Sequence, residues 1–445
     1  MCASSLTYGK LYCMLPMKNV FIVSLGIFMV GSVLCAVAST SAAFIVGRAI
    51  AGLGGAGIVN GANIMISHVA PLRYRPMLLG LAGGVECMAI AVGPIIAGAI
   101  TTYSTWRVCF YINIPVSVIA IVVAVTCVSH AELAREPTEA TQFGDIFEFF
   151  QKIDVPGIMI LIPMVVCLLL GLQWGGSTYA WKSAPVIVTL VAAAVLLGIF
   201  GIQQQRKGPL ATVQPGMLRY RSVTLGACMS FCNAAALYIV GYYLLLWYQT
   251  VLSFSVFKSG IYDLAYDLGF VLSILSAGFI TSWIGYYTPT MVAGSTLMSI
   301  GAGLLTTLNP GSNMVAVIFY QIIFSVGNGL AYQQPYVAVQ TVLKKELIPS
   351  ALTMLSFAQS LGGTISLAAA QAAYLSSLDT HEGNQIGISA DGMALIYGSG
   401  KATLDIMNQA IVAPFYIATA FSAFTMISAL GVNWNSVKEN KKDAK

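Results

Sequence analysis

Twelve long apolar runs divide this chain, and each is long enough to cross a membrane as a helix. A helix rises about 1.5 Å per residue, so about 20 apolar residues cover the roughly 30 Å hydrocarbon core of a bilayer. Charged residues make up 8% of the chain, against about 25% in a soluble domain. The sequence therefore predicts an all-α polytopic membrane protein with about 12 transmembrane helices. The runs are Val20–Ala38, Ala42–Ser67, Met77–Ile100, Val108–Val128, Val155–Leu172, Ala184–Ile202, Val223–Trp247, Gly260–Trp283, Pro289–Leu308, Met314–Val339, Ala351–Leu375 and Ile411–Gly431.

Basic residues are distributed unevenly between the loops that join these runs. If the N-terminus is cytoplasmic and the runs alternate in direction, sixteen of the 21 Lys and Arg residues lie inside. Only Arg107, Lys182, Lys258 and Lys401 then lie outside, and Arg48 lies within a run. Because Lys and Arg are enriched in cytoplasmic loops, both termini are predicted to be cytoplasmic.

The second run carries one charge, Arg48, among six glycines of the segment FIVGRAIAGLGGAGIVNG. A guanidinium at membrane depth costs at least about 2.5–3.5 kcal/mol, so it should face a partner or a water-filled cavity. The glycines allow another helix to approach closely. Arg48 is either a transport residue or a residue that locks two helices together.

Acidic residues inside the runs are few, so each is a candidate for function. Glu86 could carry the proton of a transport cycle, or it could be a neutral acid bonded to a neighbouring backbone. Asp263 and Asp267 lie one helical turn apart, and we favour solvation at the outer mouth over contact with a substrate. Polar amides and Asp267 predict a wide, mixed polar and aromatic cavity for a bulky amphipathic organic molecule. The cavity residues are predicted to be Asn63, Asp267, Asn328, Gln333, Gln334 and Gln359.

Six stretches, in order, resemble the major facilitator superfamily, and closely its fourteen-span drug:proton antiporters of fungi. VGRAIAGLGGAG resembles the arginine motif around Arg48, and VGPIIAGAI resembles the antiporter motif through Gly93, Pro94 and Gly98. GKLYCMLPMK resembles a degenerate loop motif between the family's second and third spans. WRVCFYINIP, LQWGGSTYAW and YYLLLWYQ resemble further family stretches. The loop-motif residues are Gly9, Lys10 and Lys18.

This resemblance implies a major facilitator bundle that exports a small organic compound by proton antiport. Arg48 and Glu86 are the implied proton-coupling residues, and Gly93, Pro94 and Gly98 are the implied gating residues. The twelve runs would correspond to family spans 3–14, so we expect a truncated chain or a gene model that starts too late. A weak second copy of the loop motif, Ser276–Pro289, lacks the basic residue that is common there.

The predicted partners are a small-molecule substrate, protons and the lipid bilayer, and no nucleic acid is expected to bind. We expect a monomer in the plasma membrane. A vacuolar membrane is the alternative location. No cofactor or metal is predicted, because the nine cysteines have no His or carboxylate cluster beside them. An enzyme is disfavoured for the same reason. Alternative functions are siderophore or basic-amino-acid transport, and a truncated, non-transporting remnant. We expect an incomplete N-terminal half (1–128), a cytoplasmic loop (129–154), two linking spans (155–202), a C-terminal half (203–432) with an outer loop (376–409), and a basic tail (433–445).

Overall fold

The computed structural model of the chain describes residues 1–127, 154–176, 178–379, 387–388, 394–395 and 401–438. Helices make up almost all of this part of the chain. Residues 129–153 of the predicted loop 129–154, half of the predicted outer loop 376–409 (380–386, 389–393 and 396–400) and the tail beyond residue 438 lie outside the described residues.

All twelve apolar runs lie in helices, and the N-terminal residues form one more. The N-terminal group is α1 (Cys2–Met14), α2 (Met17–Val37), α3 (Ser41–Val69), α4 (Arg75–Tyr103), α5 (Val108–Tyr111) and α6 (Asn113–Cys127). The linking pair is α9 (Val155–Trp174) and α10 (Ala184–Lys207), followed by the 3-10 turns Gly208–Leu210 and Met217–Arg219. The C-terminal group is α11 (Arg221–Thr250), α12 (Val256–Ile284), α13 (Thr288–Leu305), α14 (Met314–Tyr332), α15 (Gln334–Val342), α16 (Ile348–Asp379) and α17 (Lys401–Gly431). Two short strands, β1 (Gly387–Ile388) and β2 (Ala394–Leu395), pair antiparallel.

Local sequence explains where several helices begin and break. Thr40 and Ser255 cap α3 and α12, because their hydroxyls accept hydrogen bonds from the free backbone N–H groups of the first turn. Two apolar runs are each split into two helices, at Ile112 and at Gln333. Pro335 lies two residues after the second break, and proline has no N–H to continue the preceding helix.

Among the described residues, eleven helices are long and apolar enough to cross a membrane. The run Pro289–Leu308 folds as α13, which is not one of these eleven. Its 18 residues include several Thr, Ser and Gly residues, which lower its mean hydropathy. These small residues let it pack closely: a Cβ added at Gly294 or Gly301 would clash with α14.

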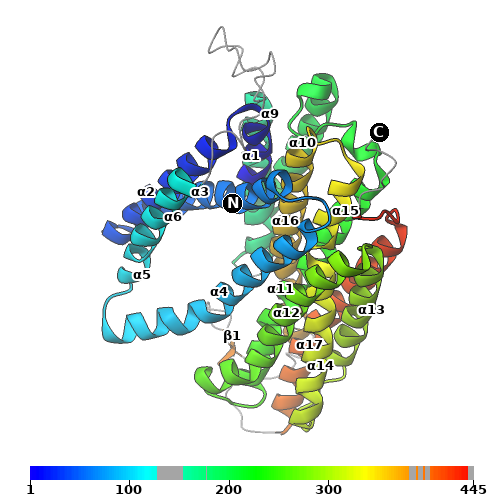
Figure 1. Cartoon of the computed structure of the whole chain (residues 1–445). Helices are drawn as coiled ribbons and strands as arrows, with labels where there is room; N and C mark the ends of the chain where they lie inside the picture. The colour runs from blue at the N-terminus through cyan, green and yellow to red at the C-terminus, as the bar shows by residue number, and fades with distance from the viewer. Residues whose placement is uncertain (128–153, 177, 380–386, 389–393, 396–400, 439–445) are drawn as a thin grey trace.

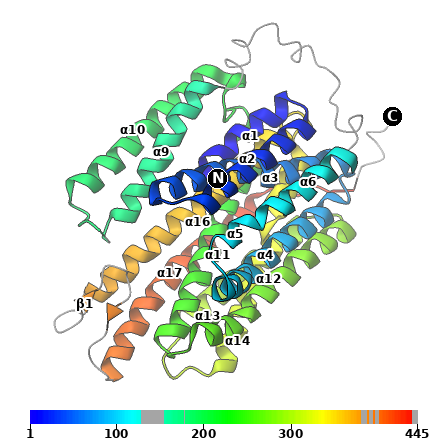
Figure 2. The same ribbon diagram turned by 90° about the vertical axis from the view of Figure 1, so that its left-hand side faces the viewer.

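The helices form two groups that meet through α4 and α1 (Figures 1 and 2). Helix α4 packs along α12, and α1 packs against α16, while α9 and α10 form a hairpin on one flank. One hydrophobic core joins α1, α3, α9 and the C-terminal group, and it includes Tyr12, Ile64, Leu161, Tyr287 and Leu352. The other large core lies within the C-terminal group. The two groups are therefore joined mainly at one end of the bundle.

We call this end the inner end. It carries the α1–α2 connection, the α12–α13 turn and residues 432–438, and the basic-residue distribution predicts that it faces the cytoplasm. The opposite, outer end carries β1 and β2 (Figure 1).

Candidate functional site

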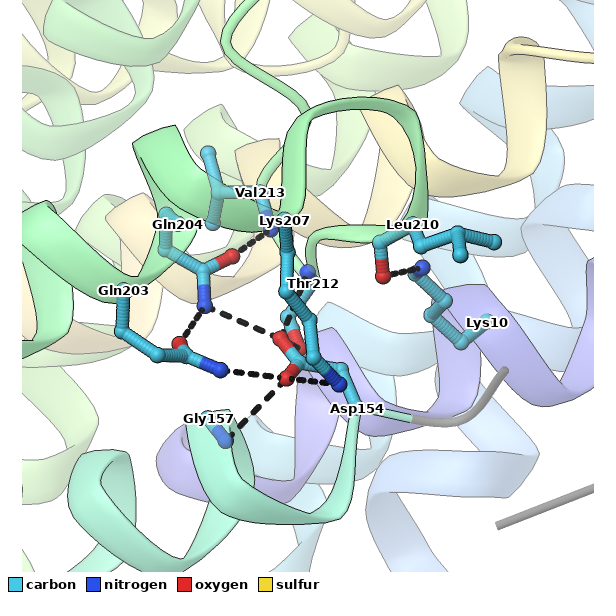
Figure 3. A network of polar contacts seen from close by, with 9 residues as sticks. All are labelled: Lys10, Asp154, Gly157, Gln203, Gln204, Lys207, Leu210, Thr212 and Val213. Carbon is cyan, nitrogen blue, oxygen red and sulfur yellow. Dashed lines mark hydrogen bonds and ion pairs between the residues drawn. The ribbon is translucent and has the colours of Figure 1, made fainter. Parts of the chain in front are cut away.

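A network of polar contacts surrounds Asp154 at the inner end (Figure 3). The Asp154 carboxylate accepts hydrogen bonds from Gln203 Nε2 (2.6 Å) and Gln204 Nε2 (2.9 Å). Thr212 donates twice, from its backbone N (3.1 Å) and its hydroxyl (2.9 Å). Lys207 Nζ forms an ion pair with Asp154 at 3.0 Å. The network ties the start of α9 to the end of α10 and to the segment that leads to α11.

Asp154 is the N-cap residue of α9, directly before its first residue, Val155. Its side chain accepts from Gly157 N at 3.2 Å and so caps the helix. Its backbone is left-handed (φ 59°), and its side chain is fully buried. Burial by itself would raise the pKa of the carboxyl, but the hydrogen bonds from Gln204, Gln203, Lys207 and Thr212 lower it below its usual value. Asp154 is therefore held as a carboxylate.

The loop-motif residue Lys10 lies beside this network. Its ammonium group donates a hydrogen bond to Leu210 O, so α1 contacts the segment that Thr212 fixes to Asp154. Lys10 is buried, and this burial lowers its pKa to about 8, against the opposing attraction of Asp154. Sequence reasoning singled out Lys10 but missed Asp154, whose only signal was a charge at the edge of an apolar run.

The other loop-motif residues make two separate helix contacts. A Cβ added at Gly9 would clash with Thr353, so glycine allows α1 to lie directly against α16. Lys18 Nζ donates to Val125 O at 2.8 Å, in the last turn of α6, where a cation is favoured by the helix dipole. Gly9 and Lys10 lie inside helix α1, and not in the loop that the motif name suggests.

Arg75 makes a second link between the two groups, which the sequence analysis did not predict. Arg75, the first residue of α4, donates to Ala70 O at 2.9 Å and to Gln340 Oε1 of α15 at 3.4 Å. Nearby, a Cβ added at Gly278 of α12 would lie only 2.5 Å from Pro76 O. A Cβ added at Gly80 would lie 2.9 Å from Ile274 O. The closest approach of α4 and α12 is thus at the inner end.

Gly93 and Gly98, two of the implied gating residues, make no close helix contact in this structure. No heavy atom lies within 4 Å of a Cβ added at either glycine. Helix α4 is continuous from Arg75 to Tyr103, through Pro94. It lies along α12 near its start, and its far end runs toward α5 (Figure 1). The outer part of α4 therefore has no close helix neighbour at these two positions.

Arg48 and Glu86 lie apart on α3 and α4. The Arg48 guanidinium lies 5.8 Å from the centre of the Phe110 ring on α5. Glu86 is exposed, while its neighbour Cys87 packs in a cluster with Phe270 of α12. Among the residues that the structure describes, no ion pair joins Arg48 to Glu86. A direct pair between the two predicted coupling residues is therefore not present in this conformation.

Five of the six predicted cavity residues lie in the C-terminal group, but they have different surroundings. Gln334 Oε1 accepts from Thr281 at 3.2 Å, and Gln359 Oε1 accepts from Tyr336 at 2.7 Å. Gln333 lies against α4, because its Nε2 is 2.6 Å from a Cβ added at Gly83. Asn328 contacts Met298 Sδ at 3.4 Å. The side-chain oxygens of Gln333 and Asn328 are buried without a hydrogen-bond partner. Asn63 lies on α3 and Asp267 on α12.

The chain is similar in sequence to known membrane transporters over nearly all of its length. A family model described as Major Facilitator Superfamily matches residues 2–367. The aspyridones efflux protein of Neocamarosporium betae is 34% identical over 455 residues, which cover 99% of this chain and 80% of that protein. The MFS-type efflux pump MFS1 of Arthroderma benhamiae is 36% identical over 456 residues, with 99% and 83% covered.

Solved structures of low identity share the fold. The human organic anion transporter MFSD10 aligns with a TM-score of 0.61 at 11% identity, over 97% of this chain and 80% of that one. The proton:xylose symporter XylE aligns with a TM-score of 0.60 at 14% identity, over 98% and 86%. A family model that matches most of its length and relatives that match nearly all of it establish that the chain belongs to the major facilitator superfamily.

Proposed function

We propose that this transporter exports a small organic compound, such as a secondary metabolite or a drug, across the plasma membrane in exchange for protons. The observation that carries the proposal is the match over 99% of the chain to a protein named for efflux of aspyridones. Another relative, from Penicillium rubens, is named as an efflux pump and is 34% identical over 98% of the chain. The substrate is proposed to be bulky and amphipathic.

The geometry suits a transporter that exposes its cavity to one side at a time. The N-terminal and C-terminal groups contact each other at the inner end through Gly9 and Thr353, Arg75 and Gln340, and Gly80 and Gly278. At the outer end, Gly93 has open space around it. We infer that this conformation is closed at the inner end, and that substrate release to the outside occurs from it.

We further propose roles for the individual candidate residues. Glu86, on the helix that packs against α12, is proposed to take up and release the coupled proton. Arg48 is proposed to assist it, and Asn63, Asp267, Asn328 and Gln333 are proposed to contact the substrate, with Gln334 and Gln359 shaping the cavity. Gly93, Pro94 and Gly98 are proposed to seal the outer end when the inner end opens. Two helical halves joined by the linking pair are the proposed domains of the chain.

Efflux from whole cells tests the proposal. The full chain is expressed in a yeast strain without its own drug pumps, and the cells are loaded with rhodamine 6G or an aspyridone. We expect faster loss of the probe than from cells that carry the empty vector. Equal loss of both probes at equal membrane abundance would count against export of this class of compound.

A further inference from the structure

Residues 432–438 fold back across the turn between α12 and α13, and we call this segment the C-terminal strap. Val437 N donates to Gly285 O at 2.9 Å, and the Ser436 hydroxyl donates to the same oxygen at 3.1 Å. Ser436 also forms an antiparallel bridge with Tyr286. The Tyr287 hydroxyl donates to Asn433 O in the strap. Three hydrogen bonds and the bridge that one of them forms thus fix the strap to the three residues of the turn.

The strap is also part of the hydrophobic core of the inner end. The side chains of Val437 and Tyr287 are fully buried, and Val432 is 2% exposed. All three belong to the core that joins the N-terminal and C-terminal groups. The strap is therefore held by packing as well as by hydrogen bonds.

Gly285 is the point at which the strap and the turn fit together. It ends α12 with φ +90°, a left-handed conformation that favours glycine. The aliphatic carbons Cε, Cδ and Cγ of Lys438 lie 2.7, 2.8 and 3.0 Å from a Cβ added at Gly285. The space that a side chain would need at Gly285 is filled by Lys438.

This turn lies within Ser276–Pro289, the second copy of the loop motif, which has no basic residue of its own. Seven residues before Gly285, Gly278 makes the closest approach of α12 to Pro76 at the start of α4. Between them, Thr281 contacts Thr290 at 3.2 Å and Gln334 at 3.2 Å. The position of the turn is thus connected to the contact that closes the inner end.

We define the inner gate as the contact between α4 and α12 at the inner end. We propose that the C-terminal strap stabilises this gate in its closed position. It brings Lys438 to a loop that lacks a lysine or arginine, and it holds α12 in the position at which Gly278 meets α4. Opening of the inner end requires α12 and α4 to separate, so the strap favours the closed conformation. The link from gate to export rests on the proposed function, but the effect of the strap on the gate can be measured without any substrate.

Hydrogen–deuterium exchange of the full chain in lipid nanodiscs is the test. The variants are Lys438→Ser, Ser436→Ala and a deletion of residues 432–445. The controls are a deletion of residues 439–445, which leaves the strap intact, and Lys345→Ser, which removes an exposed lysine elsewhere at the inner end. Exchange is read in the α12–α13 turn and in the first turns of α4.

We expect Ser436→Ala to speed exchange in the turn by about fivefold, as for the loss of one net hydrogen bond. Lys438→Ser and the longer deletion should speed exchange in both the turn and the start of α4. Neither control should change either region. Faster exchange in the turn alone, with α4 unchanged in every variant, would overturn the gate role and leave a local structural contact. Unchanged exchange in the point variants, whose fold is kept, would overturn the proposal entirely. If the parental protein shows no efflux, the proposed function fails while these exchange results still decide the role of the strap.

Discussion

Lys207 in the last turn of α10 lies 3.0 Å from Asp154 at the start of α9, so an ion pair closes the inner end of the linking hairpin. The same carboxylate also holds Thr212, beyond the end of α10. One side chain thus connects both linking helices and the segment that Lys10 contacts from α1.

We predict that Asp154→Ala destabilises the protein strongly. The substitution leaves several buried donors without an acceptor, and we expect a loss of about 2–4 kcal/mol in the free energy of unfolding. The thermal midpoint of the purified protein in detergent measures this loss. Glu346→Ala, at an exposed acidic residue, is the control and should leave the midpoint unchanged. A midpoint for Asp154→Ala equal to that of the parent would show that the network contributes little.

The lowered pKa of Lys10 predicts a specific pH dependence. Its pKa in the folded protein is about 8, below its ordinary value of 10.5. Between these values the unfolded chain binds more protons than the folded one, so stability from this residue rises with pH from about 8 to 10.5. Lys10→Met removes the titration. The difference in thermal midpoint, parent minus Lys10→Met, should therefore grow from pH 7 to pH 10. A constant difference over this range would contradict the assignment.

The contact between α4 and α12 predicts opposite outcomes for two glycine substitutions. Gly278→Leu places a side chain against Pro76 O, so we expect a lower thermal midpoint and a poorly closed inner end. Gly98→Leu enters open space and should leave the midpoint unchanged. If Gly98 seals the outer end in the other conformation, Gly98→Leu should still lose export. Normal export by Gly98→Leu would remove it from the gate.

How far the sequence predicted the structure depends on the range of the interactions involved. The twelve runs were confirmed as helices, because a long apolar segment can satisfy its backbone groups in a membrane only within itself. The network of Asp154 was not foreseen, since its partners lie 49–58 residues away in sequence. Gly278 was likewise indistinguishable from Gly98 by residue type. Which glycine has a close neighbour depends on how α4 packs against α12.

Arg48 is predicted to act in transport more than in folding. Its contact with the Phe110 ring is a single cation–aromatic contact at 5.8 Å, which contributes about 0.5–1 kcal/mol at an exposed site. Arg48→Ala should therefore keep normal membrane abundance and lose efflux, and Arg48→Lys should keep part of it. Phe110→Leu is the matched control, because it removes the ring and leaves the charge. Loss of Arg48→Ala from the membrane would instead support the helix-locking alternative.

Proton exchange in proteoliposomes tests the central claim most directly. Vesicles with an acidic lumen and trapped pyranine are supplied with rhodamine 6G, and dye uptake and lumenal pH are followed together. For the parental protein, the account predicts dye uptake with a simultaneous rise of lumenal pH, and loss of uptake when nigericin removes the pH gradient. For Glu86→Gln, it predicts dye uptake that does not depend on the gradient. Dye uptake by the parental protein that proceeds equally with and without the gradient, and with no change in lumenal pH, would contradict it.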